Sequence, residues 1–299
     1  MIIARREQVD FGNTLKRYQA FGADAANSFD GSHFTKIINE GRETFAIRLS
    51  TVEEGICLTH SSTAKGTDTL AAARRAAQKL LGLDFDLDAF YDFSKGDPVL
   101  RKVVKKYPGL RPTLTISPFE MIVTSITAQQ INLKFAFSTR SAFVRAYGDP
   151  FIFEGDSFFS FPTPERVAML EIAELRQLKF STRKAKYIIG LAQAITSGKL
   201  NLAKLATMDD ARIHDELLKL KGIGQWTVDW FMARYLGRGD AIAVGDLGVR
   251  KAIGHYYFNG EKKSVEETQD FARRWGQFSN LAIHYLLFDL YMGTEPTAQ

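Results

Sequence analysis

Apolar and polar residues alternate along the N-terminal part of the chain, between residues 34 and 60. The alternation is clearest at residues 44–49, and residues 39–42 before them have the composition of a hairpin turn. The period then becomes helical over residues 67–83, where an apolar face ends at Gly82 as a cap. Strands followed by a packed helix predict a small α+β unit built on an antiparallel sheet.

An acidic and aromatic run at residues 84–92 interrupts this periodicity, and every element that can be recognised after it is helical. Residues 1–95 are therefore predicted to form the sheet domain, and residues 96–299 an all-helical domain of two lobes. The fold class is α+β. Helices are predicted at residues 98–106, 117–147, 164–178, 182–197, 208–220, 225–236, 247–257 and 264–289.

Composition narrows the class of protein. Of the 299 residues, 45% are hydrophobic and 24% charged, which is typical of a soluble globular chain. The net charge of +5 fits a polyanionic partner, but such a charge is as common in proteins without one. The single cysteine, Cys57, leaves too few thiolates for a disulfide or an iron–sulfur cluster. Without a signal-like or membrane-spanning segment, we expect a cytoplasmic protein with no membrane partner.

The most informative segment is residues 217–227, where an apolar helix end runs into Gly222-Ile223-Gly224 and then into another amphipathic helix. Glycines adopt positive φ and allow close backbone approach, and the N–H groups that open the second helix point outward at the positive end of its dipole. This arrangement binds phosphate. A plain helix cap and turn explains most such tripeptides, but the positive charge of Lys219 and Lys221 favours phosphate.

A carboxylate, Asp246, follows this turn by about twenty residues. Its position predicts an N-cap for the helix that begins next, and aspartate is favoured there. A catalytic role is the alternative, and the two are compatible. Asp229 and Asp240 are weaker candidates, because they lie on the preceding helix and in a Gly-Arg-Gly loop.

The order of these segments resembles a known family. Leu-Lys-Gly-Ile-Gly-Gln-Trp-Thr followed by Val-Gly-Asp-Leu-Gly-Val-Arg resembles the helix-hairpin-helix and the Gly/Pro-rich loop with aspartate of the HhH-GPD superfamily of DNA glycosylases. Residues 106–112 and 118–132 resemble its 3-methyladenine DNA glycosylase II branch. The resemblance covers most of the chain and implies a hairpin at about residues 208–236 and a catalytic loop at about residues 237–250.

The resemblance implies that Asp246 faces the sugar of a flipped nucleotide. A carboxylate there stabilises the oxocarbenium charge that develops as the N-glycosidic bond breaks, and it orients the attacking water. The hairpin is implied to grip DNA phosphates, together with an alkali metal ion, Na⁺ or K⁺, as the only bound cofactor. The implied metal ligands are the backbone carbonyls of Leu218, Leu220 and Ile223. The expected DNA-binding residues here are Gly222, Ile223, Gly224, Thr227, Lys221 and Arg250.

Trp226 and Trp230 lie four residues apart, on one face of a helix. Paired helical aromatics usually belong to the core, but the resemblance implies that these two line the base pocket. Indoles stack well on cationic alkylated purines. Near the C-terminus the branch has further pocket aromatics, whereas this chain has leucines, with Leu286 expected at the pocket. This departure leaves the range of lesions open and includes oxidised guanine.

The resemblance also predicts a wedge that fills the hole left by the flipped base. It lies in Gln129, Gln130 and Ile131, with Gln130 as the inserted side chain. On the residues alone, a polar junction between helix and loop that contacts no ligand is an equal interpretation.

Superfamily members that also cleave the DNA backbone carry a lysine in the first positions of the second hairpin helix, because its amine forms a Schiff base with the sugar. Here that position is interpreted as Gln225, whose amide cannot do so. We therefore predict a monomeric, monofunctional glycosylase that removes alkylated purines such as 3-methyladenine and 7-methylguanine from double-stranded DNA.

Three other functions remain as alternatives. A glycosylase for oxidised or deaminated purines would use the same residues. A non-catalytic protein that binds DNA lesions would need the hairpin but not Asp246. A helical enzyme for small molecules would leave the hairpin without a purpose.

Overall fold

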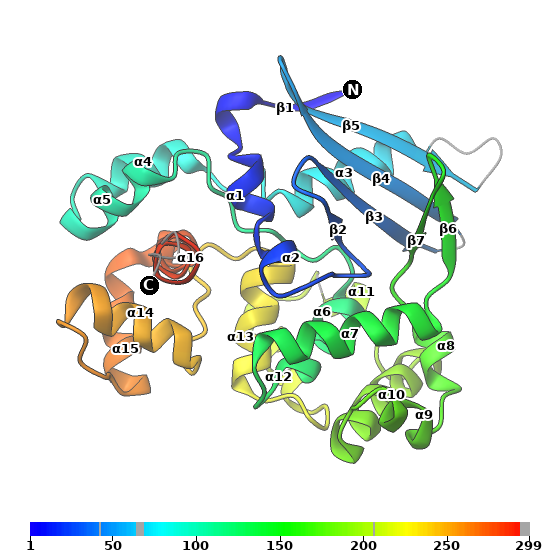
Figure 1. Cartoon of the computed structure of the whole chain (residues 1–299). Coiled ribbons are helices and arrows are strands. Elements are labelled where there is room, and N and C mark those ends of the chain that lie inside the picture. Colours follow the sequence, from blue (N-terminus) through cyan, green and yellow to red (C-terminus); the bar gives the residue numbers. More distant parts are fainter. Residues whose placement is uncertain (42, 64–68, 206, 294–299) are drawn as a thin grey trace, which may run out of the picture.

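The computed structural model describes residues 1–41, 43–63, 69–205 and 207–293. Its N-terminal part is a five-stranded antiparallel sheet in the order β1-β5-β4-β3-β2 (Figure 1). The strands are β1 (Ile2–Arg5), β2 (Ser28–Phe29), β3 (His33–Glu40), β4 (Glu43–Val52) and β5 (Gly55–Ser62). The predicted sheet is confirmed, and Arg42 of the predicted turn lies outside the described residues.

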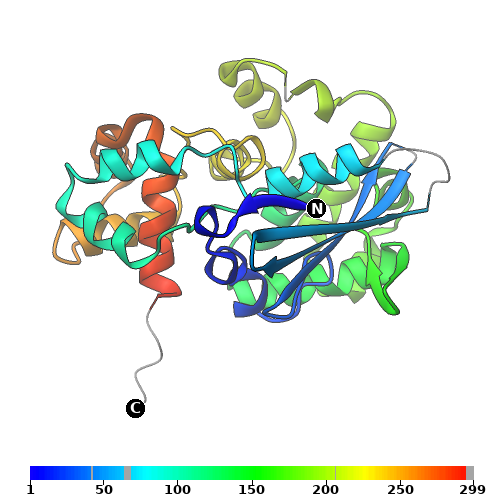
Figure 2. The same cartoon turned by 90° about the horizontal axis from the view of Figure 1, so that it is seen from above.

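Helix α3 (Leu70–Leu80) covers one face of this sheet (Figure 2). Ala73 and Ala77 of this helix are fully buried and pack with the inward-facing residues of β4, which include Phe45 and Ile47. Small side chains let the helix approach the sheet closely. The predicted helix at residues 67–83 is thus present, although its first two residues lie outside the described part of the chain.

Short helical segments lie between β1 and β2 and follow α3. They are η1 (Arg6–Gln8), α1 (Phe11–Leu15), α2 (Arg17–Ala20), α4 (Leu87–Ser94) and α5 (Pro98–Lys106). The segment joining α1 to α2 reaches the C-terminal end of the fold, because Lys16 Nζ donates a hydrogen bond to the carbonyl of Met292 at 2.8 Å. The first helices of the chain therefore border the last.

The remaining chain is helical apart from one hairpin. Its helices are α6 (Pro118–Ala128), α7 (Leu133–Tyr147), α8 (Pro164–Ala168), α9 (Ile172–Gln177), α10 (Thr182–Thr196), α11 (Leu202–Leu205), α12 (Asp210–Leu218), α13 (Gln225–Phe231), η2 (Met232–Leu236), α14 (Leu247–Tyr257), α15 (Val265–Ala272), η3 (Arg273–Phe278) and α16 (Ser279–Tyr291).

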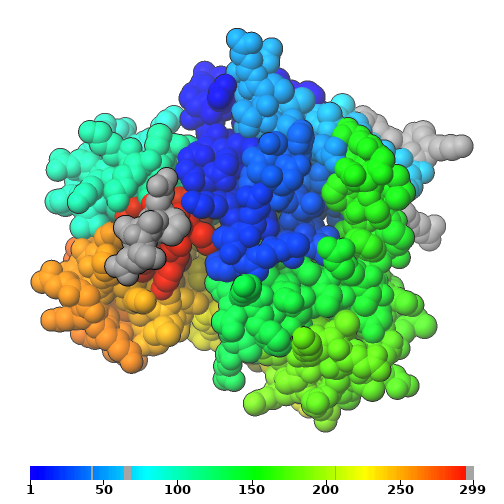
Figure 3. All heavy atoms as spheres, viewed as in Figure 1, coloured from blue at the N-terminus to red at the C-terminus, as the bar shows by residue number. Residues whose placement is uncertain are grey.

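These helices form two lobes with separate hydrophobic cores, as predicted. One core belongs to α6 through α13, and the other to α4, α5 and α14 through α16. In the space-filling view, the N-terminal domain lies above the green first lobe and beside the second lobe (Figure 3). Trp230 packs against both cores, so it lies where the two lobes meet.

The prediction that every element after residue 92 is helical is wrong at β6 (Pro150–Phe153) and β7 (Asp156–Phe159), which form a two-stranded hairpin. Glu154 and Gly155 join the strands with φ of 51° and 88°, as a two-residue hairpin turn requires. Phe151 and Phe153 pack against the first sheet.

Several predicted helices are in fact divided into two or three. The one predicted at residues 117–147 breaks between α6 and α7, where Gln130 has a φ of 56° and Asn132 caps α7. The one predicted at residues 164–178 is α8 and α9, and the one at 264–289 is α15, η3 and α16. Side-chain caps and positive φ values end a helix while its apolar period continues.

Two buried ion pairs join the sheet domain to the first helical lobe. Lys36 Nζ on β3 lies 2.9 Å from Glu120 Oε2 on α6, and both side chains are 3% exposed. Asp24, which precedes β2, pairs with Arg140 on α7. Each buried charge therefore has its counter-charge within the protein.

Candidate active site

Asp246 is the N-cap of α14, and its carboxylate accepts hydrogen bonds on both oxygens. Oδ1 accepts from the backbone amides of Gly248 and Val249 at 2.7 and 3.2 Å. Oδ2 accepts from the indole Nε1 of Trp226 at 2.7 Å and of Trp230 at 3.3 Å. The cap therefore fixes one oxygen, while the other faces the two indoles.

The two tryptophans occupy successive turns of α13, which brings both indole N–H groups to the same oxygen. Both side chains are half-buried. Structure and sequence agree on this grouping: the predicted carboxylate and the predicted aromatic pair come together from segments sixteen to twenty residues apart.

Gln225 does not face the carboxylate. Its Nε2 donates to Asp229 Oδ1 at 2.6 Å, and its Oε1 lies 2.6 Å from His214 Nε2 on α12. Successive helical residues point in directions about 100° apart, so the first-turn residue that faces Asp246 is Trp226. The position predicted for Gln225 is therefore occupied by Trp226, one residue later in the chain. The side chain of Trp226 has no amine either.

Asp229 and Asp240, the two weaker candidates for the catalytic carboxylate, lie in other surroundings. Asp229 is engaged by Gln225, and burial raises the pKa of its carboxyl. Asp240 is exposed in the loop between η2 and α14.

The connection between α12 and α13 has the predicted tight hairpin. Gly222 has a φ of 89°, and a Cβ at this position would lie 2.2 Å from the ring of Tyr187, so only glycine fits. Gly224 opens α13 as an exposed N-cap that offers no side chain, which leaves the first amides of the helix without a side-chain cap. Lys221 beside it is exposed.

The other predicted hairpin residues are placed as follows. Ile223 and Thr227 are buried. The carbonyl of Leu220 accepts the amide of Ile223 at 3.2 Å, which closes the turn. Leu218 ends α12 with a side chain that is 40% exposed.

The predicted wedge lies against this hairpin. Gln129 Nε2 donates to the carbonyl of Gly222 at 2.9 Å and to Thr227 Oγ1 at 3.3 Å. Lys184 Nζ on α10 donates to the carbonyls of Thr127 and Gln129 at 2.8 and 2.7 Å. The exposed Gln130 thus stands on a turn that α10 and the hairpin hold from two sides.

Leu286 does not line the site, contrary to the prediction, because it is fully buried in the core of the second lobe. Its neighbour Leu287 is half-buried, and its Cδ2 lies 3.7 Å from the place where a Cβ on Gly248 would stand. A shift of one residue along α16 turns the side chain toward the Asp246 loop. Arg250, on α14, is half-buried, and its Nε has no hydrogen-bond partner among the described residues.

Sequence reasoning missed Arg234, which lies one turn beyond Trp230 in the π-helical segment η2. Its guanidinium lies 5.1 Å from the centre of the Trp230 ring, and Nη1 donates to Asn280 Oδ1 on α16. Asn280 in turn donates to the carbonyls of Ala233 and Arg238 at 3.0 and 2.9 Å. The signal for Arg234 in the sequence is its position four residues after Trp230, which places both side chains on the same face of a helix.

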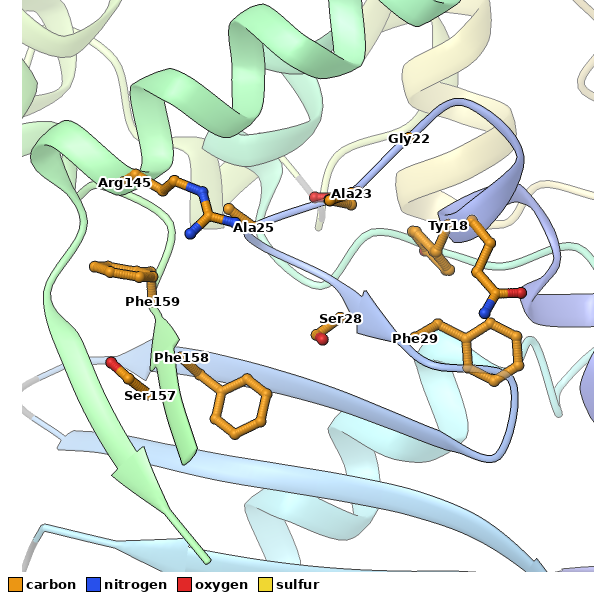
Figure 4. Close-up of a pocket in the computed structure, with 12 residues that line it drawn as sticks. Tyr18, Gly22, Ala23, Ala25, Ser28, Phe29, Arg145, Ser157, Phe158 and Phe159 are labelled. Carbon is orange, nitrogen blue, oxygen red and sulfur yellow. The ribbon is translucent and has the colours of Figure 1, made fainter. Parts of the chain in front are cut away.

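Two surface hollows lie elsewhere on the molecule. One, of about 340 Å³, lies between the α2–β2 segment and the β6–β7 hairpin (Figure 4), and the other, of about 380 Å³, adjoins α3. Neither includes Asp246. Residues labelled in the first are Tyr18, Gly22, Ala23, Ala25, Ser28, Phe29, Arg145, Ser157, Phe158 and Phe159.

The described residues contain no group of three or more His, Cys, Asp or Glu side chains arranged to hold a metal ion. Within the same residues, no helix has the length and apolarity that crossing a membrane requires.

Two protein-family models match the chain. The one described as HhH-GPD superfamily base excision DNA repair protein matches residues 123–277, and the one described as 8-oxoguanine DNA glycosylase, N-terminal domain, matches residues 1–122. The chain belongs to the HhH-GPD superfamily. Both the expected family and the expected fold class are confirmed.

Individual relatives point to one branch of this superfamily. A DNA-3-methyladenine glycosylase of Bacillus subtilis (strain 168) is 34% identical over 209 residues, which are 70% of this chain and 69% of that protein. DNA-3-methyladenine glycosylase 2 of Escherichia coli (strain K12) is 24% identical over 229 residues, 77% of this chain and 76% of that protein.

Among solved structures, the 3-methyladenine DNA-glycosylase from Archaeoglobus fulgidus matches with a TM-score of 0.86 and 27% identity, over 96% of this chain and 98% of that one. The expectation of a base excision DNA glycosylase similar to the 3-methyladenine branch is therefore confirmed. The N-terminal family model is named for 8-oxoguanine glycosylases, whereas the Archaeoglobus fulgidus structure matches both the N-terminal and the helical parts of this chain.

Proposed function

We propose that this HhH-GPD protein hydrolyses the N-glycosidic bond of damaged purines in double-stranded DNA, including alkylated purines, without cleaving the backbone. The observation that supports the proposal most directly is the half-buried Asp246 carboxylate, held by two amides on one oxygen and by two indoles on the other. It lies between a helical hairpin suited to phosphate and the junction of the two lobes.

In this proposal, Asp246 stabilises the charge that develops at the sugar. The bond from C1′ to the base nitrogen breaks and its electron pair leaves with the base, so C1′ becomes positive. Oδ2, which faces the indoles and not the backbone of α14, is the oxygen proposed to meet this charge. Water, oriented by the carboxylate, then adds to C1′, and the proton that it loses is taken up by the departed base.

The tryptophans serve two purposes. Their N–H groups hold the carboxylate in place, and their ring faces offer a stacking surface for the flipped base. Leu287 supplies an aliphatic surface near the same loop.

Hydrolysis without strand cleavage follows from the first turn of α13. The side chain that meets Asp246 there is the indole of Trp226, whose nitrogen is not nucleophilic, and the neighbouring Gln225 is turned away. A Schiff base with C1′ requires an amine at that place. We therefore expect an abasic site with an intact backbone as the product.

The hairpin would hold the DNA. The amides that open α13 and the charge of Lys221 suit a phosphate. The carbonyls of Leu218, Leu220 and Ile223 are hard oxygen donors of the kind that Na⁺ or K⁺ accepts, and a bound ion would add positive charge beside that phosphate. Gln130, exposed on its braced turn, would fill the space left by the flipped nucleotide.

The test compares the wild type with Asp246→Asn on methylated duplex DNA. Asparagine keeps an oxygen for the cap but removes the negative charge, so we expect release of methylpurines to fall by about 10³-fold or more. Asp240→Asn, which changes an exposed carboxylate in the same loop, is the matched control and should retain wild-type activity. Released bases are measured by chromatography.

Strand integrity is followed in the same reaction with and without alkali. Nicks that appear only after alkali show a monofunctional enzyme, whereas direct nicks would refute that part of the proposal. Tight duplex binding without release of any damaged base would favour a non-catalytic lesion-binding protein.

A further inference from the structure

The candidate active site takes one part from each helical lobe. Trp226 and Trp230 belong to α13, which packs into the core of the first lobe, whereas Asp246 opens α14 in the second lobe. The hydrogen bonds from the two indoles to the carboxylate, at 2.7 and 3.3 Å, therefore cross the junction between the lobes. A residue that fixes this junction also fixes the distance from the carboxylate to the tryptophans.

Asn280 on α16 binds the segment that leaves α13. Its side chain is fully buried. Nδ2 donates to the carbonyls of Ala233 and Arg238 at 3.0 and 2.9 Å. Oδ1 accepts from Arg234 Nη1, and the backbone amide of Asn280 donates to the carbonyl of Gly239 at 2.8 Å. One residue of the second lobe thus contacts η2, which continues α13, at four points.

The chain needs these contacts because η2 ends here. The last carbonyls of a helix have no partner within the helix, and a buried carbonyl without a partner is costly. Gly237 then turns the chain with a φ of 68°, and a Cβ on Gly239 would lie 2.3 Å from the carbonyl oxygen of Gln277. The backbone after η2 therefore lies directly against the start of α16, and Asn280 supplies the donors that the helix end lacks.

The contact extends to the active site through Arg234. The guanidinium that Asn280 holds lies 5.1 Å from the centre of the Trp230 ring. Trp230 donates the longer of the two indole hydrogen bonds to Asp246, so a small displacement of its ring is enough to break that bond. Contacts between neighbouring side chains thus run from α16 to the catalytic carboxylate.

We infer that Asn280 is a positioning residue. It holds η2 and α13 of the first lobe on α16 of the second lobe, and it thereby keeps the Trp230 indole within hydrogen-bonding distance of Asp246. This inference rests on the proposed function. Without the contact, Asp246 Oδ2 loses one of its two indole donors and its fixed direction toward C1′, whereas the hairpin that is proposed to bind DNA is unchanged.

The test is Asn280→Asp, which has nearly the same shape. Aspartate keeps an oxygen for Arg234 but has no N–H group for the two carbonyls, so the turn is released while the guanidinium stays paired. Single-turnover release of 7-methylguanine from duplex DNA at saturating enzyme should slow by about tenfold or more, and the Kd for the duplex should change by less than about twofold.

Asp289→Asn is the matched control, because it makes the reverse exchange on the same helix at another buried position. Its carboxylate accepts from Lys106, Tyr107 and Tyr256, which all lie on the second-lobe side of the junction. The control disturbs this lobe without releasing η2, so its rate should stay within about twofold of the wild type even if its stability falls.

An NMR measurement separates positioning from loss of stability. The chain has three tryptophans, so ¹⁵N labelling gives three indole N–H resonances, and Asp246→Asn identifies the two that depend on the carboxylate. In Asn280→Asp we expect the Trp230 resonance to move upfield as its hydrogen bond weakens. In Asp289→Asn it should keep its wild-type position.

A folded Asn280→Asp variant with an unmoved Trp230 resonance and a rate within about twofold of the wild type overturns the inference while the proposed function stands. Equal slowing in Asn280→Asp and Asp289→Asn also overturns it, because the cause is then destabilisation of the lobe. If Asn280→Asp fails to fold, Asn280→Ser takes its place, since its shorter neutral side chain also leaves the two carbonyls without their donor. No release of damaged purines by the wild type refutes the proposed function, and the resonance alone then decides whether Asn280 holds Trp230 against Asp246.

Discussion

Two groups of buried charges in this molecule are built in opposite ways. At the junction between sheet and first lobe, Lys36 meets Glu120 and Arg140 meets Asp24, so every charge is paired. Arg17 and Arg234 have no carboxylate partner among the described residues, and the Nε of Arg17 is buried without a hydrogen-bond partner there. The first group is balanced within the protein, whereas the second carries positive charge that no counter-charge in the described residues balances.

Because of this difference, we expect substitution of the paired charges at the junction to lower the free energy of unfolding far more than substitution of the unpaired arginines. Lys36 also donates to the carbonyl of Ala26 and to Asn27 Oδ1, so the amine has four acceptors in all. Removing it would leave the Glu120 carboxylate buried beside these unpaired oxygens. By contrast, removing an unpaired guanidinium leaves no new unpaired charge.

The largest effect on stability is expected for Lys36→Met. The variant strands a carboxylate that is 3% exposed, and the free energy of unfolding should fall by about 3–5 kcal/mol. Urea denaturation followed by circular dichroism measures this. Lys95→Met, which breaks the exposed pair with Asp92, is the control and should change stability by about 0.5 kcal/mol or less. Equal losses in the two variants would remove the basis of the comparison.

A smaller effect is expected at the hairpin, where sterics and not charge fix the geometry. Gly222→Ala places a Cβ against the Tyr187 ring at a φ of 89°, so we expect a loss of about 1–3 kcal/mol and about tenfold weaker duplex binding. Gly224→Ala is the matched control, because a Cβ there meets nothing within 4 Å. Binding is measured by fluorescence anisotropy. If the control weakens binding as much, the cause is contact with DNA and not the shape of the turn.

The hairpin and the caps show how much the sequence reveals. Asp246, the tight turn and the tryptophan pair were predictable, because each is specified by residues close together in the chain. The β6–β7 hairpin also has a local signal, Glu154-Gly155 between phenylalanine-rich segments.

What the sequence could not supply was orientation to within one residue and contacts between distant segments. Neighbouring residues on a helix point in directions about 100° apart, and packing of the lobes decides which of them faces the site. This is why the site contains Trp226 in place of Gln225, and Leu287 in place of Leu286. The contacts of Asn280 join α16 to η2 and the loop after it, and no spacing in the chain indicates them.

A still smaller effect on stability is expected for Lys184→Met, because Lys184 donates hydrogen bonds to backbone carbonyls and does not pair with a carboxylate. The variant leaves the carbonyls of Thr127 and Gln129 without this donor, so stability should fall by about 1–2 kcal/mol. The turn that carries Gln130 loses one of its two attachments, and base flipping, followed with 2-aminopurine fluorescence, should slow. Lys186→Met, an exposed lysine of the same helix, is the control. Unchanged flipping with reduced stability would make Lys184 a structural residue alone.

The smallest effect, and the one with the opposite sign, is expected for Arg17→Met. The guanidinium lies 5.7 Å from the centre of the Tyr18 ring but has no ion pair among the described residues, and its Nε is buried without a partner. Methionine keeps most of the aliphatic stem and removes both this unsatisfied donor and the repulsion from Arg234. Stability of the protein should therefore be unchanged or rise by up to about 1 kcal/mol. A clear loss of stability would show that Arg17 is satisfied within the protein, as Lys36 is, and the contrast between the two groups of charges would disappear.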